Sequence, residues 1–97
     1  MNTVKELTKI CHDIAKNKGF WDSQRNIGEM LMLVVTELSE AMEAYRIQDE
    51  AGFKEEIADT FIRMFDLCGG LEIDIEKEIK KKMRRNKKRP YKHGKIC

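Results

Sequence analysis

The spacing of the apolar residues and the position of the single proline constrain this chain most. Pro90 is the only proline, and no segment alternates apolar and polar residues as a half-buried strand does. Apolar residues instead recur every three to four positions, which is the period of an α-helix. The sequence therefore predicts an all-α fold that resembles a four-helix bundle.

Capping residues and glycines divide the chain into four expected helices. Residues that favour helix starts precede the four segments: Thr3 (in a capping box with Glu6), Asp22 or Ser23, Asp49, and Asp74. Glycines punctuate the helix ends: Gly19 stops the first helix, and Gly69-Gly70 breaks or kinks the third. The second helix is expected to run to about residue 47, so that a short turn joins it to the third.

The second helix is expected to be buried, because residues 30–35 are apolar on every side of it. Its predicted core-facing residues recur at helical spacing: Ile27, Leu31, Val34, Leu38, Met42 and Tyr45. A chain of 97 residues buries only a modest fraction of its surface. We therefore expect oligomerisation to complete the core.

Composition indicates a single domain over residues 1–97. The longest apolar run, residues 30–35, is too short to span a bilayer, and the mixed residues 1–10 do not resemble a signal peptide. The three cysteines are scattered and form no CxxC pair, which is typical of reduced cytoplasmic thiols. The expected protein is cytoplasmic and has no membrane partner.

Charge is distributed unevenly along the chain. Residues 80–97 hold ten Lys and Arg and no acid, whereas residues 1–79 hold nine basic and all 17 acidic residues, a net charge of −8. Residues 86–97 are expected to form a basic, partly ordered arm. Such a chain binds phosphates either through a metal held by the acids or directly through the arm.

Four carboxylates are the main candidates for a site. Glu37-x-x-Glu40 and Glu56-x-x-Asp59 each place two acids one turn apart on one helix face. The four positions are symmetric about residue 48, so a hairpin that turns there sets Glu40 level with Glu56, and Glu37 level with Asp59. Oxygen-only ligands of this kind suit Mg²⁺ or Mn²⁺.

Two other interpretations of these acids are possible: a solvated helix face, which remains open, and a di-iron site, which the sequence supports only weakly. Such pairs are common on solvated helix faces, and Asp59 could simply pair with Arg63 one turn on. A di-iron carboxylate bundle requires ExxH on two helices. Here positions 40 and 59 are Glu and Asp, and neither His12 nor His93 follows a Glu at that spacing.

Two further groups are candidates for substrate binding. In the basic run, residues 82–89 could hold phosphate oxygens, although a solvated helix end is the alternative for any single lysine. Asn86 is distinctive in this run, because its amide adds no charge. Before the second helix, Trp21 either offers a ring for stacking on a base or caps the end of the bundle. Arg25 and Asn26 follow it and could contact a base edge or a phosphate.

Together these residues resemble the MazG-like nucleoside triphosphate pyrophosphohydrolases of the all-α NTP pyrophosphatase superfamily. The resemblance rests on Glu37-x-x-Glu40 and Glu56-x-x-Asp59 across a turn, on Lys82, Asn86 and Arg89 at Lys-x-x-x-Asn-x-x-Arg spacing, and on the aromatic and Arg-Asn residues between 19 and 26. It covers nearly the whole chain. One departure is Thr36, where many members carry an additional glutamate.

The resemblance implies hydrolysis of ribo- or deoxynucleoside triphosphates to the monophosphate and pyrophosphate, in nucleotide-pool housekeeping, with Mg²⁺ as the metal and Mn²⁺ as a possible substitute. It also implies a homo-oligomer, either a dimer or a tetramer, with sites near the subunit interfaces. The four carboxylates would hold the metal and perform the catalysis, and the substrate would contact Trp21, Arg25, Asn26, Lys82, Asn86 and Arg89. The alternative function is a non-catalytic nucleic-acid-binding module that uses the basic arm. A third possibility is a plain helical dimerisation module.

Overall fold

A computed structural model describes residues 2–97 and consists of four α-helices. They are α1 (Val4–Asn17), α2 (Ile27–Arg46), α3 (Glu50–Gly70) and α4 (Ile75–Lys87), followed by a short 3₁₀ turn, η1 (Tyr91–Gly94). Residues 2–97 contain no strand. The all-α prediction is therefore confirmed.

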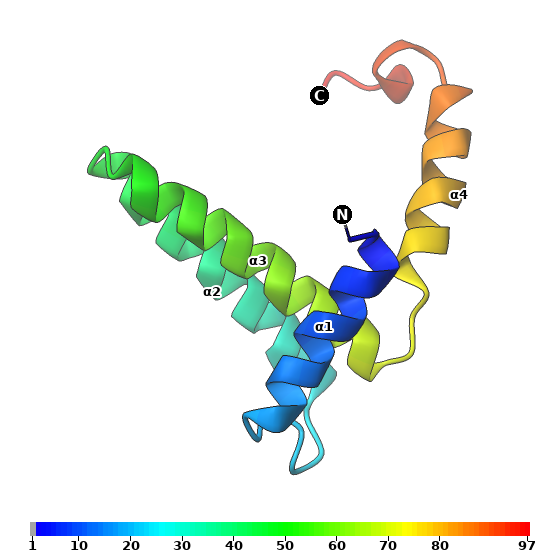
Figure 1. Cartoon of the computed structure of the whole chain (residues 1–97). Coiled ribbons are helices and arrows are strands. Elements are labelled where there is room, and N and C mark those ends of the chain that lie inside the picture. The colour runs from blue at the N-terminus through cyan, green and yellow to red at the C-terminus, as the bar shows by residue number, and fades with distance from the viewer. Residues whose placement is uncertain (1) are drawn as a thin grey trace.

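Helices α2 and α3 form an antiparallel hairpin (Figure 1). The turn between them lies at residues 47–49, and Gln48 at its centre has a positive φ of 60°. Asp49 then caps α3, because its Oδ1 accepts a hydrogen bond of 2.9 Å from the amide of Gly52. The predicted turn at residue 48 and the predicted cap at Asp49 are both confirmed.

Side-chain caps also start the other helices, with one difference from the prediction. Thr3 and Glu6 form the expected capping box, and Asp74 caps α4. Helix α2 begins later than expected, because Asn26 caps it by accepting a 3.0 Å hydrogen bond from the amide of Glu29. The cap predicted at Asp22 or Ser23 is wrong, since the chain is still in the turn and bend that follow α1.

Two glycines at the C-terminal end of α3 allow close packing, Gly69 against α1 and Gly70 against Trp21 in the segment that follows α1. A Cβ atom at Gly69 would lie 2.6 Å from the Cβ of His12, and one at Gly70 would overlap the ring of Trp21. Contacts this close exclude any larger residue unless the helices move apart. Gly69-Gly70 therefore serve close packing, and α3 continues helically through both of them.

The hairpin buries a different side of α2 from the one predicted. The α2 side chains that are buried are Met30, Val34, Glu37 and Ala41. The remaining residues of the predicted stripe are about half or more exposed: Ile27 (50%), Leu31 (46%), Leu38 (48%), Met42 (57%) and Tyr45 (67%). Of the predicted stripe only Val34 is buried, and a single chain leaves Leu31, Met32 and Val35 about half or more exposed.

Helix α4 stands apart from the hairpin and packs mainly against α1 (Figure 1). Helix α3 is the centre of the molecule, since it packs against both α1 and α2. Within residues 2–97 the chain thus forms a three-helix core with a projecting fourth helix. None of its described helices is long and apolar enough to cross a membrane.

Candidate metal centre

A polar stripe runs along α3 on the side that faces its neighbours. It contains Glu56, Asp59, Arg63 and Asp66, which follow one another at spacings of three, four and three residues. This spacing keeps the four side chains on one helix face. Charged groups at a packed helix surface require partners, because an uncompensated charge is costly to remove from water.

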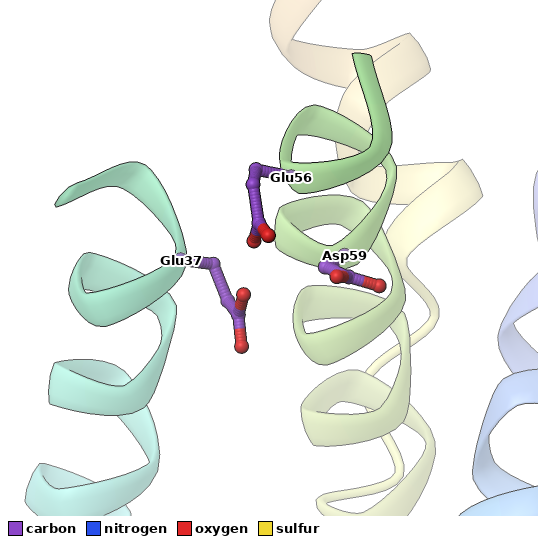
Figure 2. Close-up of side chains that lie close together, drawn as sticks. All are labelled: Glu37, Glu56 and Asp59. Carbon is purple, nitrogen blue, oxygen red and sulfur yellow. The ribbon is translucent and has the colours of Figure 1, made fainter. Parts of the chain in front are cut away.

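Three carboxylates from the two helices of the hairpin come together at this stripe. One oxygen each from Glu37, Glu56 and Asp59 lies within 4.8 Å of the others. Figure 2 shows Glu37 reaching from α2 toward α3, with Glu56 pointing into the space between the helices. Glu40 is exposed and lies outside this group of three, yet it is close enough to Glu56 to affect its ionisation.

Arg63, the third residue of the polar stripe, faces Glu37. Its Nε donates a hydrogen bond of 2.7 Å to Oε1 of Glu37, whose side chain is only 11% exposed. This bond holds the pKa of Glu37 below its ordinary value, with burial acting in the opposite direction. Arg63 therefore pairs across the hairpin with Glu37, and its proposed local pair with Asp59 does not form.

Glu56 is in the opposite electrostatic situation. The adjacent Glu37 carboxylate, together with burial and the neighbouring Glu40, raises the pKa of Glu56 to about 7. Its Oε2 atom is buried and has no hydrogen-bond partner among the described residues. An ionised Glu56 at this position lacks a compensating positive group.

The donor set fits a hard divalent cation. Three carboxylate oxygens from two rigid helices converge, and a buried oxygen of Glu56 is left without a partner. Mg²⁺ and Mn²⁺ bind oxygen ligands and retain coordinated water or phosphate at the remaining positions. A bound cation would satisfy Glu56 Oε2 and remove the repulsion between the acids.

Asp66, at the C-terminal end of the polar stripe, organises the packing of α1 and of the segment before α2. Its carboxylate accepts hydrogen bonds from Trp21 Nε1 at 2.8 Å and from Arg25 at 3.5 Å, and contacts His12 Nδ1 at 2.9 Å. The guanidinium carbon of Arg25 also lies 5.1 Å from the centroid of the Trp21 ring. These contacts tie three segments together beside the carboxylate cluster.

The residues near the start of α2 that were predicted to bind substrate mostly make packing contacts and hydrogen bonds within the chain. The Trp21 ring packs against Gly70 and lies edge-on to His12 at 5.0 Å between ring centroids, so much of its surface is already covered. The side-chain oxygen of Asn26 is occupied by the α2 cap. Arg25 pairs with Asp66 and lines a cavity that also contacts Glu37 and Asp59.

The predicted phosphate-binding residues of the basic run are not brought to the carboxylates within one chain. Lys82 and Asn86 are on α4, and Arg89 follows it, whereas the carboxylates lie on the hairpin on the other side of α1 (Figure 1). Asn86 is half-buried and its Oδ1 has no hydrogen-bond partner among residues 2–97. Within one chain, the basic residues therefore lie apart from the carboxylates, although the resemblance implies that both contact the same substrate.

Sequence reasoning missed the roles of Arg63 and Asp66. The signal was present, because both continue the Glu56–Asp59 face at helical spacing. What the spacing did not identify is the partner of each, since Glu37 lies 26 residues from Arg63, and Trp21 lies 45 residues from Asp66. Thr36, where relatives of the resembled family carry an acid, is exposed and donates its hydroxyl to the carbonyl of Met32.

Comparison with known proteins adds no family to this description. No protein-family model matches the chain, and comparisons with curated proteins and with solved structures gave no significant match.

Proposed function

We propose that this chain hydrolyses nucleoside triphosphates to the nucleoside monophosphate and pyrophosphate, with Mg²⁺ or Mn²⁺ held by Glu37, Glu56 and Asp59. The observation that carries the proposal is the convergence of these three carboxylates, one of which has a buried and unpartnered oxygen. The order and spacing of the motifs that resemble MazG-like enzymes support the same reaction.

The residues around the cluster have distinct roles in this proposal. A bound divalent ion would neutralise charge on the phosphates and lower the pKa of a coordinated water. Arg63 keeps Glu37 ionised at neutral pH, so that a negative ligand is always available. Glu40, the exposed acid outside the group of three, is the carboxylate left to accept a proton from the water that attacks the α-phosphorus.

A second copy of the chain is part of this proposal. The exposed face of α2 carries a row of apolar residues at alternating spacings of four and three: Leu31, Val35, Leu38, Met42 and Tyr45. This is the spacing of a helix–helix packing seam. Each of the first four residues of this row directly follows one of the α2 residues that are buried against α3. Two hairpins that pack through the exposed row would therefore form the core that one chain lacks.

Association would also supply the missing phosphate contacts. Lys82, Asn86 and Arg89 lie away from the carboxylates of their own chain, so in this proposal they reach the site of a neighbouring copy. The same arm favours the alternative function, since residues 80–97 are exposed apart from Asn86. A basic, exposed arm of this kind binds nucleic acid through phosphate contacts alone.

The experiment that tests the proposal is a pyrophosphate-release assay with ribo- and deoxynucleoside triphosphates in the presence of Mg²⁺. Native protein is compared with Glu56→Gln and Asp59→Asn, and with Glu55→Gln as the matched control, since Glu55 is an exposed neighbour on the same helix. The proposal expects turnover that the first two substitutions abolish and the control retains. Absence of turnover with either Mg²⁺ or Mn²⁺, combined with salt-sensitive nucleic-acid binding that requires residues 80–97, would favour the alternative.

A further inference from the structure

A cavity beside the carboxylate cluster has the size and lining of a small-molecule site. It measures about 350 Å³ and is lined by parts of α1, α2, α3 and the segment between α1 and α2. Small-molecule pockets in proteins begin at about 300 Å³ and combine apolar walls with a few polar groups. This cavity is therefore large enough for a specific ligand.

The cavity shares two walls with the candidate metal centre. Glu37 and Asp59 belong both to the group of three carboxylates and to the cavity lining. Arg63, the partner of Glu37, also lines the cavity. A ligand that fills the cavity therefore has one part next to the carboxylates. A nucleotide whose phosphates lie at the metal would place its remaining part in this space.

The rest of the lining combines apolar side chains with one aromatic ring and three charged residues, Lys18 and the paired Arg25 and Asp66. Cys11, Ile14 and Ala15 come from α1, and Ile62 comes from α3. Phe20 adds an aromatic side chain that is 61% exposed, and so its ring is free for stacking. Lys18 also lines the cavity and makes no ion pair within the described residues.

Phe20, and not Trp21, is the aromatic residue at this cavity. The ring of Trp21 is held by Asp66, Gly70 and His12 and does not contribute to the lining. Aromatic rings in binding sites stack on nucleobases of any kind, since each base has a π-face. An apolar wall beside an exposed aromatic ring, the unpaired Lys18 and the paired Arg25 and Asp66 suits a base and sugar better than a purely apolar ligand.

We infer that this cavity binds the nucleoside part of the triphosphate, with Phe20 stacking on the base. The inference rests on the proposed function for the location of the phosphates. It adds the residues that distinguish a nucleotide from a bare polyphosphate, namely Phe20 and the α1 wall at Ala15. Trp21, Asp66 and Arg25 then act as the frame that keeps this wall in place.

The test is a calorimetric titration of the full-length protein in the presence of Mg²⁺ with two kinds of probe, one that carries a nucleoside but cannot be cleaved and one that has no nucleoside. The first probe is a set of α,β-methylene nucleoside triphosphates, and the second is inorganic tripolyphosphate. The variants are Phe20→Ala, which removes the ring, and Ala15→Met, which fills the cavity. Tyr91→Ala is the control, because Tyr91 is 89% exposed and lies outside the cavity lining.

The inference expects Phe20→Ala to weaken binding of the nucleotide analogues by roughly tenfold or more, the usual effect of losing one stacked base. Ala15→Met should weaken the same probes, whereas tripolyphosphate should bind both variants as it binds native protein. Tyr91→Ala should behave like native protein with both probes. Circular dichroism melting of each variant separates a loss of binding from a loss of fold.

Two results would overturn the inference. One is nucleotide binding that neither cavity variant changes, and the other is no nucleotide binding by the native protein. Failure of the proposed hydrolysis has a different signature, in which Glu56→Gln and Asp59→Asn leave the affinity for both probes unchanged. A cavity that binds nucleotides without any need for the carboxylates would thus uphold this inference and contradict the proposed function.

Discussion

The Nε atom of Arg63 on α3 lies 2.7 Å from Oε1 of Glu37 on α2, and this pair fixes how the two helices of the hairpin face each other. The Glu37 side chain is nearly buried, while that of Arg63 is 37% exposed. The pair joins residues 26 positions apart and lines the cavity beside the candidate metal centre.

Removal of the Arg63 side chain should destabilise the fold by leaving the Glu37 carboxylate buried without its partner. We expect Arg63→Met to lower the free energy of unfolding by about 1–3 kcal/mol at pH 7. The matched control is Arg46→Met, which breaks a surface pair with Glu43 whose two side chains are each 65% exposed. That change should cost less than about 1 kcal/mol.

Urea denaturation measures both values, and its pH dependence adds a second check. The lowered pKa of Glu37 means that the pair stabilises the fold above the ordinary value of 4.5 and is lost as the pH falls through the lowered pKa. The difference between native protein and Arg63→Met should therefore shrink in acid. Equal losses for Arg63→Met and Arg46→Met at pH 7 would contradict this role of the pair.

The raised pKa of Glu56 predicts a pH-dependent stability in the absence of divalent metal. A carboxyl whose pKa is about 7 in the folded state stabilises the fold below its ordinary value of 4.5, and this contribution is lost as the pH rises through 7. The melting temperature of metal-free protein should therefore fall between pH 5 and pH 8. Glu56→Gln should flatten this part of the curve, whereas Glu55→Gln should preserve it.

Addition of Mg²⁺ at pH 8 should restore stability to native protein and not to Glu56→Gln, because a cation compensates the ionised carboxylate. Melting curves at several pH values, with and without Mg²⁺, provide the measurement. A native protein whose melting temperature has the same pH dependence as that of Glu56→Gln would contradict the assignment.

Asp66 should contribute to the free energy of unfolding by an amount similar to that of Arg63, because it joins α3 to α1 and to the segment before α2. Asp66→Asn removes the charge that three donors share, and we expect a loss of about 2–3 kcal/mol in the free energy of unfolding. Trp21 is the only tryptophan, so its emission should also change when its Nε1 partner is altered.

Denaturant titration followed by tryptophan fluorescence measures both effects in one experiment. Asp13→Asn is the control, since Asp13 pairs only with Lys9 on the surface of α1. Native-like stability and emission in Asp66→Asn would contradict the role given to Asp66.

The exposed seam on α2 predicts that the protein self-associates. Leu38 is at the middle of this seam and is 48% exposed in the single chain. Leu38→Glu should therefore lower the solution mass toward that of one chain, because it places a charge in an apolar interface. Ser39→Glu changes the next, exposed residue outside the seam and should leave the mass unchanged.

Light scattering after size-exclusion chromatography measures the mass of each variant. A native protein that is monomeric at all concentrations would contradict the proposed interface. It would also leave Lys82, Asn86 and Arg89 without a route to the carboxylates.

Local features of the fold were predictable from the sequence because they depend on neighbours along the chain. The capping box at Thr3, the turn at residue 48 and the cap at Asp49 each involve residues no more than a few positions apart. The approach of Glu37 to Glu56 and Asp59 followed from the same symmetry about the turn. Only Glu40 of the four predicted ligands lies outside the group of three.

The buried side of α2 was not predictable in the same way. Around residues 30–35 the helix has two neighbouring apolar seams, and hydrophobic periodicity does not distinguish which one faces α3. The ion pair of Glu37 with Arg63 joins the buried side of α2 to α3. This pair joins residues 26 positions apart, so no local pattern reports it.

Binding of Mn²⁺ followed by electron paramagnetic resonance, with Mg²⁺ as the competitor, tests the candidate metal centre most directly. The account predicts that native protein binds Mn²⁺, that Mg²⁺ displaces it, and that Glu56→Gln and Asp59→Asn lose this binding while Glu55→Gln keeps it. Absence of Mn²⁺ binding to the native chain, or equal binding by native protein and Glu56→Gln, would contradict it.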